Sequence, residues 1–153
     1  MSSACNTAKE QISMKIGFIG LGIMGRPMSR NLVKAGFDVV VCDSHKDHVD
    51  DVVQAGARAA ANAGEIARQC DVIITMVQNS PQVRAIALGD NGIAANAKPG
   101  TVLIDMSSID PVESKASGAE LAKHSIDMLD APVSGGEPKA IDGTLSVMVG
   151  GKK

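Results

Sequence analysis

A glycine-rich loop between two contrasting segments constrains the fold of this chain more than any other feature. Three glycines recur in the pattern G-x-G-x-x-G, at Gly20, Gly22 and Gly25. The apolar run Lys15–Ile19 before them is typical of a buried strand, and Gly25–Ala35 after them has the spacing of an amphipathic helix. A strand that enters such a loop and a helix that leaves it indicate a dinucleotide-binding unit.

Each glycine of the loop has its own expected task. Gly20 permits a tight turn, Gly22 lets the backbone approach a pyrophosphate, and Gly25 lets helix and strand pack closely. Free N–H groups and the positive end of the helix dipole favour phosphate at this point. We therefore predict that the cofactor is bound by Gly20, Leu21, Gly22, Ile23, Met24 and Gly25. The alternative is a glycine-rich turn without a ligand.

An acidic residue stands where this unit places its ribose ligand. Asp43 follows the second predicted strand, Asp38–Cys42, about 20 residues beyond the loop. Its carboxylate is expected to accept hydrogen bonds from the adenosine ribose and to repel a 2′-phosphate, which favours NAD. His45 and Lys46 follow, and a nearby cation would soften that repulsion, so NADP remains possible. The alternative role for Asp43 is that of a helix N-cap.

From Met14 onward, short apolar runs alternate with longer amphipathic segments. The predicted strands are Lys15–Ile19, Asp38–Cys42, Val72–Val77, Val102–Asp105, Ile126–Leu129 and Leu145–Val149. The predicted helices are Gly25–Ala35, His45–Gln54, Ala63–Cys70, Pro81–Ala87 and Pro111–His124. This alternation predicts an α/β fold with a doubly wound, mostly parallel, Rossmann-like sheet. We expect residues 1–13 to be a flexible tail and residues 14–153 to be one dinucleotide-binding domain.

Composition excludes several classes of partner. With 15 Lys and Arg against 17 Asp and Glu, no Trp or Tyr and two Phe, the chain lacks the features of a nucleic-acid-binding protein. No apolar run approaches ~18 residues, so no membrane span is expected. The odd set of Cys5, Cys42 and Cys70 has no C-x-x-C spacing, which favours reduced, unreactive thiols and a cytoplasmic location.

Two stretches of the sequence are similar to one enzyme family. The stretch from Phe18 to Gly36, with Met24 and Asn31 beyond the glycines, resembles the opening motif of the β-hydroxyacid dehydrogenases. A second match begins with Asp130–Gly136 and continues to Gly151. Within the family, Asp127–Leu129 just before this match and Glu137–Asp142 inside it are most similar to the tartronate semialdehyde reductases.

The resemblance implies an NAD(P)-dependent oxidoreductase that transfers hydride to or from a short β-hydroxy acid. For tartronate semialdehyde reductases the reaction is reduction to D-glycerate. The family also carries a C-terminal helical domain with the catalytic lysine, and that domain is absent from this chain. We therefore assign no catalytic residue here, and we expect the chain alone to be inactive. Apolar surface uncovered by the missing domain should lead either to a homo-oligomer or to a rearranged last segment, centred on Leu145–Val149.

The resemblance also implies a site for a small carboxylate substrate. Ser134, Gly135 and Gly136 are similar to the family's loop that holds the substrate carboxylate. Two glycines after a serine allow exposed N–H groups to turn toward an anion. An ordinary turn is the alternative for these residues.

Two further groups are expected beside the nicotinamide. Ser107 and Ser108 follow a predicted strand at the edge where ligands of open α/β sheets bind, and the alternative is capping of the next helix. The segment Val77, Gln78 and Asn79 is expected beside the nicotinamide ribose. Relatives commonly carry Pro where Gln78 stands, which is a departure from the family pattern.

Other readings of the sequence remain open. His45 and His48 lie among Asp43, Asp47, Asp50 and Asp51, but we expect no three of these ligands to converge, and hence no metal site. A non-catalytic NAD(P)-binding module, acting as a sensor or assembly domain, is the main alternative to an enzyme domain. An inert scaffold is a third.

Overall fold

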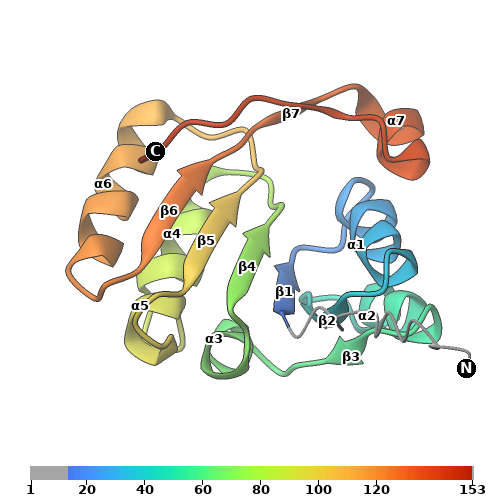
Figure 1. Cartoon of the computed structure of the whole chain (residues 1–153), viewed down its shortest axis with the longest axis horizontal. Helices are drawn as coiled ribbons and strands as arrows, with labels where there is room; N and C mark the ends of the chain where they lie inside the picture. The colour runs from blue at the N-terminus through green and yellow to red at the C-terminus, as the bar shows by residue number, and fades with distance from the viewer. Residues whose placement is uncertain (1–13, 153) are drawn as a thin grey trace, which may run out of the picture.

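The computed structural model describes residues 14–152, so the predicted flexible tail 1–13 lies outside the described residues. Its centre is a six-stranded parallel sheet in the order β3-β2-β1-β4-β5-β6 (Figure 1). The strands are β1 Lys15–Ile19, β2 Asp38–Cys42, β3 Arg58–Ala59, β4 Val72–Thr75, β5 Val102–Asp105 and β6 Asp127–Asp130. The strand order reverses between β1 and β4, which is where open α/β sheets form their ligand crevice.

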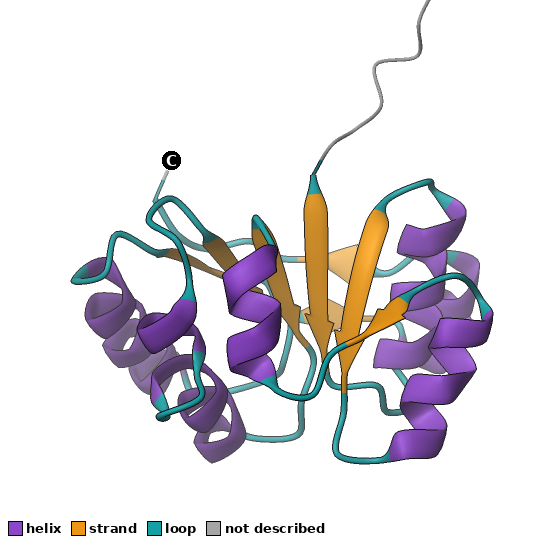
Figure 2. Cartoon of the chain, turned by 90° about the horizontal axis from the view of Figure 1, so that it is seen from below, coloured by secondary structure: helices purple, strands orange, loops and turns teal. Residues whose placement is uncertain are grey.

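Helices lie on both faces of this sheet (Figure 2). The elements are α1 Gly25–Lys34, α2 Lys46–Gln54, α3 Ala63–Gln69, α4 Ser80–Leu88, α5 Ile93–Asn96, α6 Pro111–Ala122 and α7 Gly136–Asp142. The helices α3 to α6 pack against one another and cover one face, whereas α1 and α2 cover part of the other. The predicted doubly wound, Rossmann-like fold is confirmed.

The strands separate two hydrophobic cores because successive side chains point to opposite faces of a sheet. Phe18 and Val41 enter the core beneath α1 and α2. Their chain neighbours Ile19 and Val40 enter the core beneath α3 to α6. All four are at most 5% exposed, so β1 and β2 are buried on both faces, as their unbroken apolar sequence predicted.

The C-terminal prediction of a single strand over Leu145–Val149 is wrong. Only β8, Ser146–Val147, is a strand, and it pairs antiparallel with β7, Val133–Ser134, in a separate two-stranded sheet. After α7 the chain turns back at Gly143, whose φ is 73°, and therefore meets β7 running in the opposite direction. It continues to a bridge between Gly150 and Asp130 beside β6.

Four short elements were not predicted, namely β3, α5, β7 and α7. The first two span 2 and 4 residues, which is too little sequence to show a period. The helix α7 begins after two glycines of positive φ, Gly135 and Gly136, which sequence reasoning takes as a turn. The strand β4 ends at Thr75 and not at Val77, because the Val77 amide donates to Ser107 Oγ and leaves the strand ladder.

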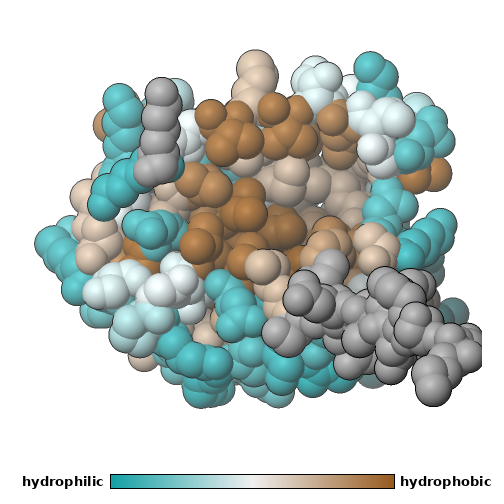
Figure 3. Space-filling model, in the orientation of Figure 1, coloured by the Kyte–Doolittle hydropathy of each residue, from teal (hydrophilic) through white to brown (hydrophobic). Residues whose placement is uncertain are grey.

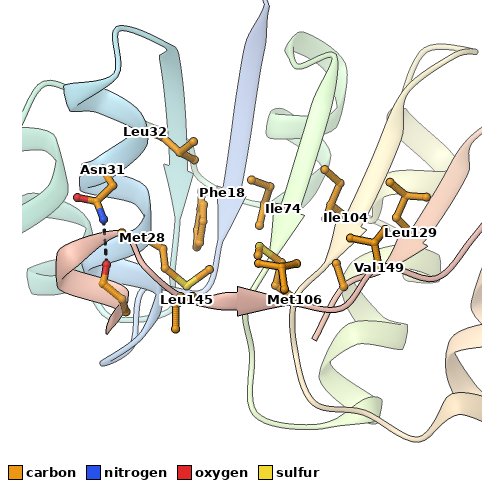
Figure 4. A pocket seen from close by; sticks show the side chains of 14 residues that line it. Phe18, Met28, Asn31, Leu32, Ile74, Ile104, Met106, Leu129, Leu145 and Val149 are labelled. Carbon is orange, nitrogen blue, oxygen red and sulfur yellow. Dashed lines mark hydrogen bonds between the residues drawn. The ribbon is translucent and has the colours of Figure 1, made fainter. Parts of the chain in front are cut away.

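One part of the sheet stays uncovered. On the face shared with α1, the side chains over β4, β5 and β6 line a cavity of about 410 Å³ under the β7–β8 pair (Figure 4). Ile74, Ile104 and Leu129 project into it from the three strands, and Leu145 and Val149 border it from the C-terminal segment. Figure 3 shows hydrophobic side chains gathered on this face and framed by polar ones.

Candidate functional site

The predicted site residues gather at one edge of the sheet. Because the strands are parallel, the segments that follow their carboxyl ends lie along the same border. The glycine loop follows β1, Asp43 follows β2, and Val77–Asn79 follow β4. Ser107 comes after β5, and β7 with α7 crosses beyond the ends of β4 to β6 (Figure 1).

Two of the loop glycines are required by packing. Gly20 has a φ of 100°, and a Cβ there would lie 2.2 Å from the Met76 carbonyl oxygen. A Cβ on Gly25 would lie 1.9 Å from the Gly20 carbonyl oxygen, which is backbone and cannot move aside. The tight turn at Gly20 and the close approach of α1 to β1 at Gly25 are therefore as predicted.

The third glycine faces open space. A Cβ on Gly22 would meet no atom within 4 Å, and the residue is exposed. Within the described part of the chain, the amides of Gly22, Ile23 and Met24 have no protein acceptor. Three unsatisfied donors beside an empty volume fit a diphosphate, because a loop at a helix start offers anions N–H groups and a positive dipole end.

The cradle is smaller than the sequence suggested. The Gly20 amide donates to the Cys42 carbonyl at 3.1 Å, and the Leu21 amide donates to Asp43 Oδ2 at 2.7 Å. The Leu21 side chain is fully buried in the core. The amides of Gly20 and Leu21 are therefore not free to bind a phosphate, because they hold the loop to the end of β2.

The Asp43 side chain lies beside the glycine loop, to which it is hydrogen-bonded. Besides the bond from Leu21, its Oδ1 accepts the His45 amide at 2.8 Å, and its side chain is 12% exposed. Burial works against its charge, but the bonds from Leu21 and His45 outweigh it and hold the pKa of Asp43 below its ordinary value. Asp43 is not the N-cap of α2, since that position is His45.

The prediction that no three of the histidine and aspartate ligands converge is wrong. One ligand atom from each of Asp43, His45 and His48 lies within 4.8 Å of the others. The reason is that His45 caps α2 and His48 lies three residues further along, so both imidazoles stand on the first turn beside the end of β2.

A buried aspartate that sequence reasoning missed organises the ends of β4 and β5. Asp105 Oδ1 accepts Thr75 Oγ1 at 2.9 Å and the Ser107 amide at 3.1 Å. Ser107 in turn accepts the Val77 amide at 2.9 Å. The signal for it was a lone acid at the end of the apolar run Val102–Asp105, just before the predicted serines.

The second oxygen of Asp105 has no hydrogen-bond partner within residues 14–152, and the residue is 0% exposed. Burial dominates, and despite the hydrogen bonds from Ser107 and Thr75 it raises the pKa of Asp105 above its ordinary value. Ser107, itself 0% exposed, is held inside the protein by this network. Its neighbour Ser108 is exposed at the edge.

Local caps account for several residues near the predicted nicotinamide position. Asn79 is the N-cap of α4 and accepts the Gln82 amide at 3.0 Å. The Gln78 amide donates to Gln82 Oε1 at 2.9 Å. The helix α6 is capped by Asp110 and not by either serine, so the alternative reading of Ser107 and Ser108 as caps is wrong.

The predicted carboxylate loop is exposed and sharply bent. Ser134, Gly135 and Gly136 are all exposed, with φ of 136° and 68° at the two glycines. The helix α7 that follows is tied to α1 by Asn31, whose Nδ2 donates to the carbonyls of Ala140 at 2.9 Å and Ile141 at 3.3 Å. Asn31 was singled out only as part of the family motif, and this bond gives it a structural task.

Neither thiol in the described residues is activated by a lowered pKa. Burial raises the pKa of Cys70 to about 11 and, with the negative charge of Asp43 next to it, raises the pKa of Cys42 above its ordinary value. Within residues 14–152, no helix is long and apolar enough to cross a bilayer.

Residues 15–153 match the family model described as the NAD binding domain of 6-phosphogluconate dehydrogenase. The chain belongs to this family of NAD-binding domains. It is 43% identical over 141 residues to a probable mitochondrial 3-hydroxyisobutyrate dehydrogenase of Dictyostelium discoideum, covering 92% of this chain and 44% of that protein. Against 2-hydroxy-3-oxopropionate reductase of Escherichia coli it is 43% identical over 145 residues, covering 90% and 47%.

Solved structures agree with this assignment. Mycobacterium tuberculosis 3-hydroxyisobutyrate dehydrogenase with L-serine superposes with a TM-score of 0.86 at 37% identity, covering 92% of this chain and 47% of that one. Psf3 in complex with NADP+ and 2-OPP gives 0.85 at 31% identity, covering 90% and 49%. The resemblance to β-hydroxyacid dehydrogenases is confirmed, and the chain spans about half the length of the relatives it matches.

Proposed function

We propose that this domain serves an oxidoreductase that moves hydride between NAD and a short β-hydroxy acid, with tartronate semialdehyde and D-glycerate as the pair. The observation that carries the cofactor part is the open cradle at Gly22, bounded by three free amides, with Asp43 fixed beside it. The substrate part rests on the Asp130–Gly151 resemblance and on relatives named as a 2-hydroxy-3-oxopropionate reductase and a 3-hydroxyisobutyrate dehydrogenase.

The chain's own residues have distinct tasks in this proposal. The amides of Gly22, Ile23 and Met24 bind the diphosphate, and Asp43 accepts the adenosine ribose hydroxyls. The network of Asp105 and Ser107 keeps the ends of β4 and β5 rigid beside the nicotinamide, with Val77–Asn79 and Ser108 lining that end. When bound, NAD supplies the hydride chemistry at its nicotinamide ring.

We further propose that Ser134, Gly135 and Gly136 hold the substrate carboxylate. Their exposure and the sharp bend of the backbone leave their polar groups open beyond the carboxyl edge of the sheet. The proton donor, a lysine in the family, is assigned to a helical part that follows the matched half of the relatives. Without a positioned acid, general acid catalysis of ~10²–10⁴-fold is lost, so the 153-residue chain should turn over negligibly.

The proposal includes a cytoplasmic location and self-association. Among the described residues, the thiols of Cys42 and Cys70 form no disulfide, which fits a reducing compartment. The β7–β8 segment covers the apolar face over β4 to β6 only in part, and Val149, which is 65% exposed, lines the cavity that remains. A second copy of this chain is the occupant that we propose for that face.

Cofactor binding is tested by separate titrations with NADH and NADPH. The chain has no Trp or Tyr, so the dihydronicotinamide fluorescence is read without protein background. We expect NADH to bind more tightly than NADPH, because the Asp43 carboxylate repels a 2′-phosphate. In Asp43→Asn the difference between the two should shrink, and failure of both nucleotides to bind the parent chain would refute the proposal.

A matched pair of glycine variants locates the binding. Gly22→Ala adds a methyl to the cradle and should weaken NADH binding ~10-fold or more without loss of stability, because only a bound ligand would meet the new atom. Gly118→Ala adds the same methyl in α6, where it would lie 3.7 Å from Met128 Cβ, an ordinary contact. Equal NADH affinity in the two variants would place the nucleotide elsewhere.

A further inference from the structure

The first turn of α2 presents an unusual set of side chains beside the end of β2. His45 and His48 are three residues apart, and their rings stack with centroids 4.8 Å apart at 28°. Each turns its Nδ1 toward the same atom, Asp43 Oδ1, at 3.2 Å from His45 and 3.4 Å from His48. Three donor atoms from a strand end and a helix start therefore converge within 4.8 Å.

These separations match the edges of a metal coordination shell. A tetrahedral Zn²⁺ ion with bonds of about 2.0–2.1 Å keeps neighbouring ligand atoms about 3.3–3.4 Å apart. The two distances from Asp43 Oδ1 already have this value. The two imidazole nitrogens would need to come closer by a side-chain rotation, which the 67% exposed His45 side chain is free to make.

The nitrogen of His48 is otherwise unexplained. His48 Nδ1 is a buried atom that makes no hydrogen bond with any described group, although Asp43 Oδ1 is its neighbour. A buried nitrogen without a partner is costly, and an ion placed between it and the carboxylate would satisfy both. Lys46, the nearest lysine in sequence, pairs with Asp50 at 2.6 Å and so does not neutralise the cluster by pairing with Asp43.

We infer that Asp43, His45 and His48 form a site for a divalent transition ion of the Zn²⁺ class, with solvent completing the shell. Two imidazoles and one carboxylate are donors that suit Zn²⁺, Co²⁺ and Ni²⁺ over Mg²⁺ or Ca²⁺. The exposed side of His45 gives the ion an entry path from solvent. This is a regulatory site by position, since one of its ligands is also the predicted ribose ligand.

The link to the cofactor rests on the proposed function. A metal ion on Asp43 Oδ1 withdraws the lone pairs that the ribose hydroxyls would use, and it places a hydrated cation where the ribose would lie. The metal and NADH therefore exclude or weaken each other. By linkage, each must lower the affinity of the other by the same factor.

The site is tested on the full 153-residue chain prepared without a histidine tag. The metal alone, ZnCl₂, is titrated calorimetrically, and CoCl₂ is followed by its visible absorption, which reports nitrogen and oxygen ligands without a sulfur charge-transfer band. We expect a single equivalent to bind. His45→Asn and His48→Asn should each weaken zinc binding at least ~10-fold, because loss of an outer-shell partner alone reduces metal affinity 10–100-fold.

The sequence offers a matched control. The chain has three histidines, and the third, His124, lies outside the cluster. His124→Asn should leave zinc affinity unchanged. Zinc binding that survives both His45→Asn and His48→Asn, or that falls equally in His124→Asn, would overturn the site. Circular dichroism of each variant confirms that a loss of binding is not a loss of fold.

A second titration separates the site from its regulatory role. With saturating zinc, NADH should bind at least ~10-fold more weakly to the parent chain and with unchanged affinity to His48→Asn. Unchanged NADH affinity in the parent would overturn the competition while leaving the metal site standing. If NADH fails to bind even without metal, the proposed function and the competition both fail, and the zinc titration alone then decides the site.

Discussion

The two halves of the sheet are built to different degrees of completeness. Around β1 to β3, α1 and α2 cover one face and α3 the other, and β1 and β2 are buried on both faces. Around β4 to β6, α4 to α6 cover one face only, and a cavity of about 410 Å³ lies on the other. The closed half holds the predicted dinucleotide cradle, and the open half offers an apolar surface to a partner.

The closed half must hold its binding groups rigidly in place, whereas the open half need only present an apolar surface. A cradle for a diphosphate must keep its amides in place before the ligand arrives, and the closed half does so with backbone bonds from Gly20 and Leu21 to the end of β2. A surface that awaits a covering element needs only apolar side chains in roughly the right place. The same small substitution should therefore change the free energy of unfolding differently in the two halves.

Adding one methyl group gives the largest expected contrast. Gly25→Ala in the closed half forces a Cβ to within 1.9 Å of a backbone oxygen, so the free energy of unfolding should fall by about 3 kcal/mol. Gly118→Ala in the open half meets Met128 only at ordinary distance and should raise it by about 0.5–1 kcal/mol through helix propensity. Urea unfolding followed by circular dichroism measures both, and equal values would break the comparison.

A charge on the open face gives a smaller effect. Val149→Lys places an ammonium beside the cavity, where a second copy would have to desolvate it, so the dimer dissociation constant should rise about 10-fold. Val112→Lys is the control, because Val112 is 72% exposed on α6, which packs against the opposite face. Sedimentation at several concentrations reads the result, and a parent chain that stays monomeric throughout contradicts self-association.

Variants of the two strand-end aspartates should change stability with opposite dependence on pH. The pKa of Asp43 is lowered in the folded protein, so its stabilisation is present above its ordinary value of 3.8 and is lost as pH falls through the lower folded value. Asp43→Asn should therefore reduce stability by about 1–2 kcal/mol at neutral pH and by less in acid.

The raised pKa of Asp105 gives its contribution to stability the opposite dependence on pH. The folded protein binds the proton more readily, so the contribution of this group falls as pH rises from 3.8 through the higher folded value. Asp105→Asn keeps an acceptor for Thr75 and Ser107, so stability at neutral pH should stay within about 0.5 kcal/mol of the parent or exceed it. Unfolding curves from acid to neutral pH test both variants, and parallel curves would show that the environments do not differ.

Sequence predicted the buried parallel strands best. The bounds of β1 and β2 in the closed half, and of β5 in the open half, agree with the apolar runs, because such strands leave an unbroken signal. The backbone roles of Gly20 and Gly25 could be predicted, because a side chain at either position would clash with backbone atoms. The partners of Gly20 and Leu21 could not be foreseen, since they depend on how closely β2 approaches the loop in space.

The open half and the histidines were harder for a physical reason. The segment Leu145–Val149 has the composition of a buried strand, but its pairing partner is decided by the direction of return after α7. The convergence of His45 and His48 on Asp43 depends on the residue at which α2 begins, and helix ends are the least determined part of a sequence pattern. The sequence showed a lone acid at Asp105, but not that its side chain would accept hydrogen bonds from Thr75 and Ser107.

The side chain of Asn31 links the movement of the glycine loop to that of the loop at Ser134–Gly136. The helix that starts at the glycine loop carries Asn31 near its far end, and there its amide grips the last carbonyls of α7, the helix that starts just after Ser134. One side chain thus couples the proposed cofactor site to the proposed substrate loop. Any axial slide of α1 on contact with a nucleotide must either carry α7 along or break that grip.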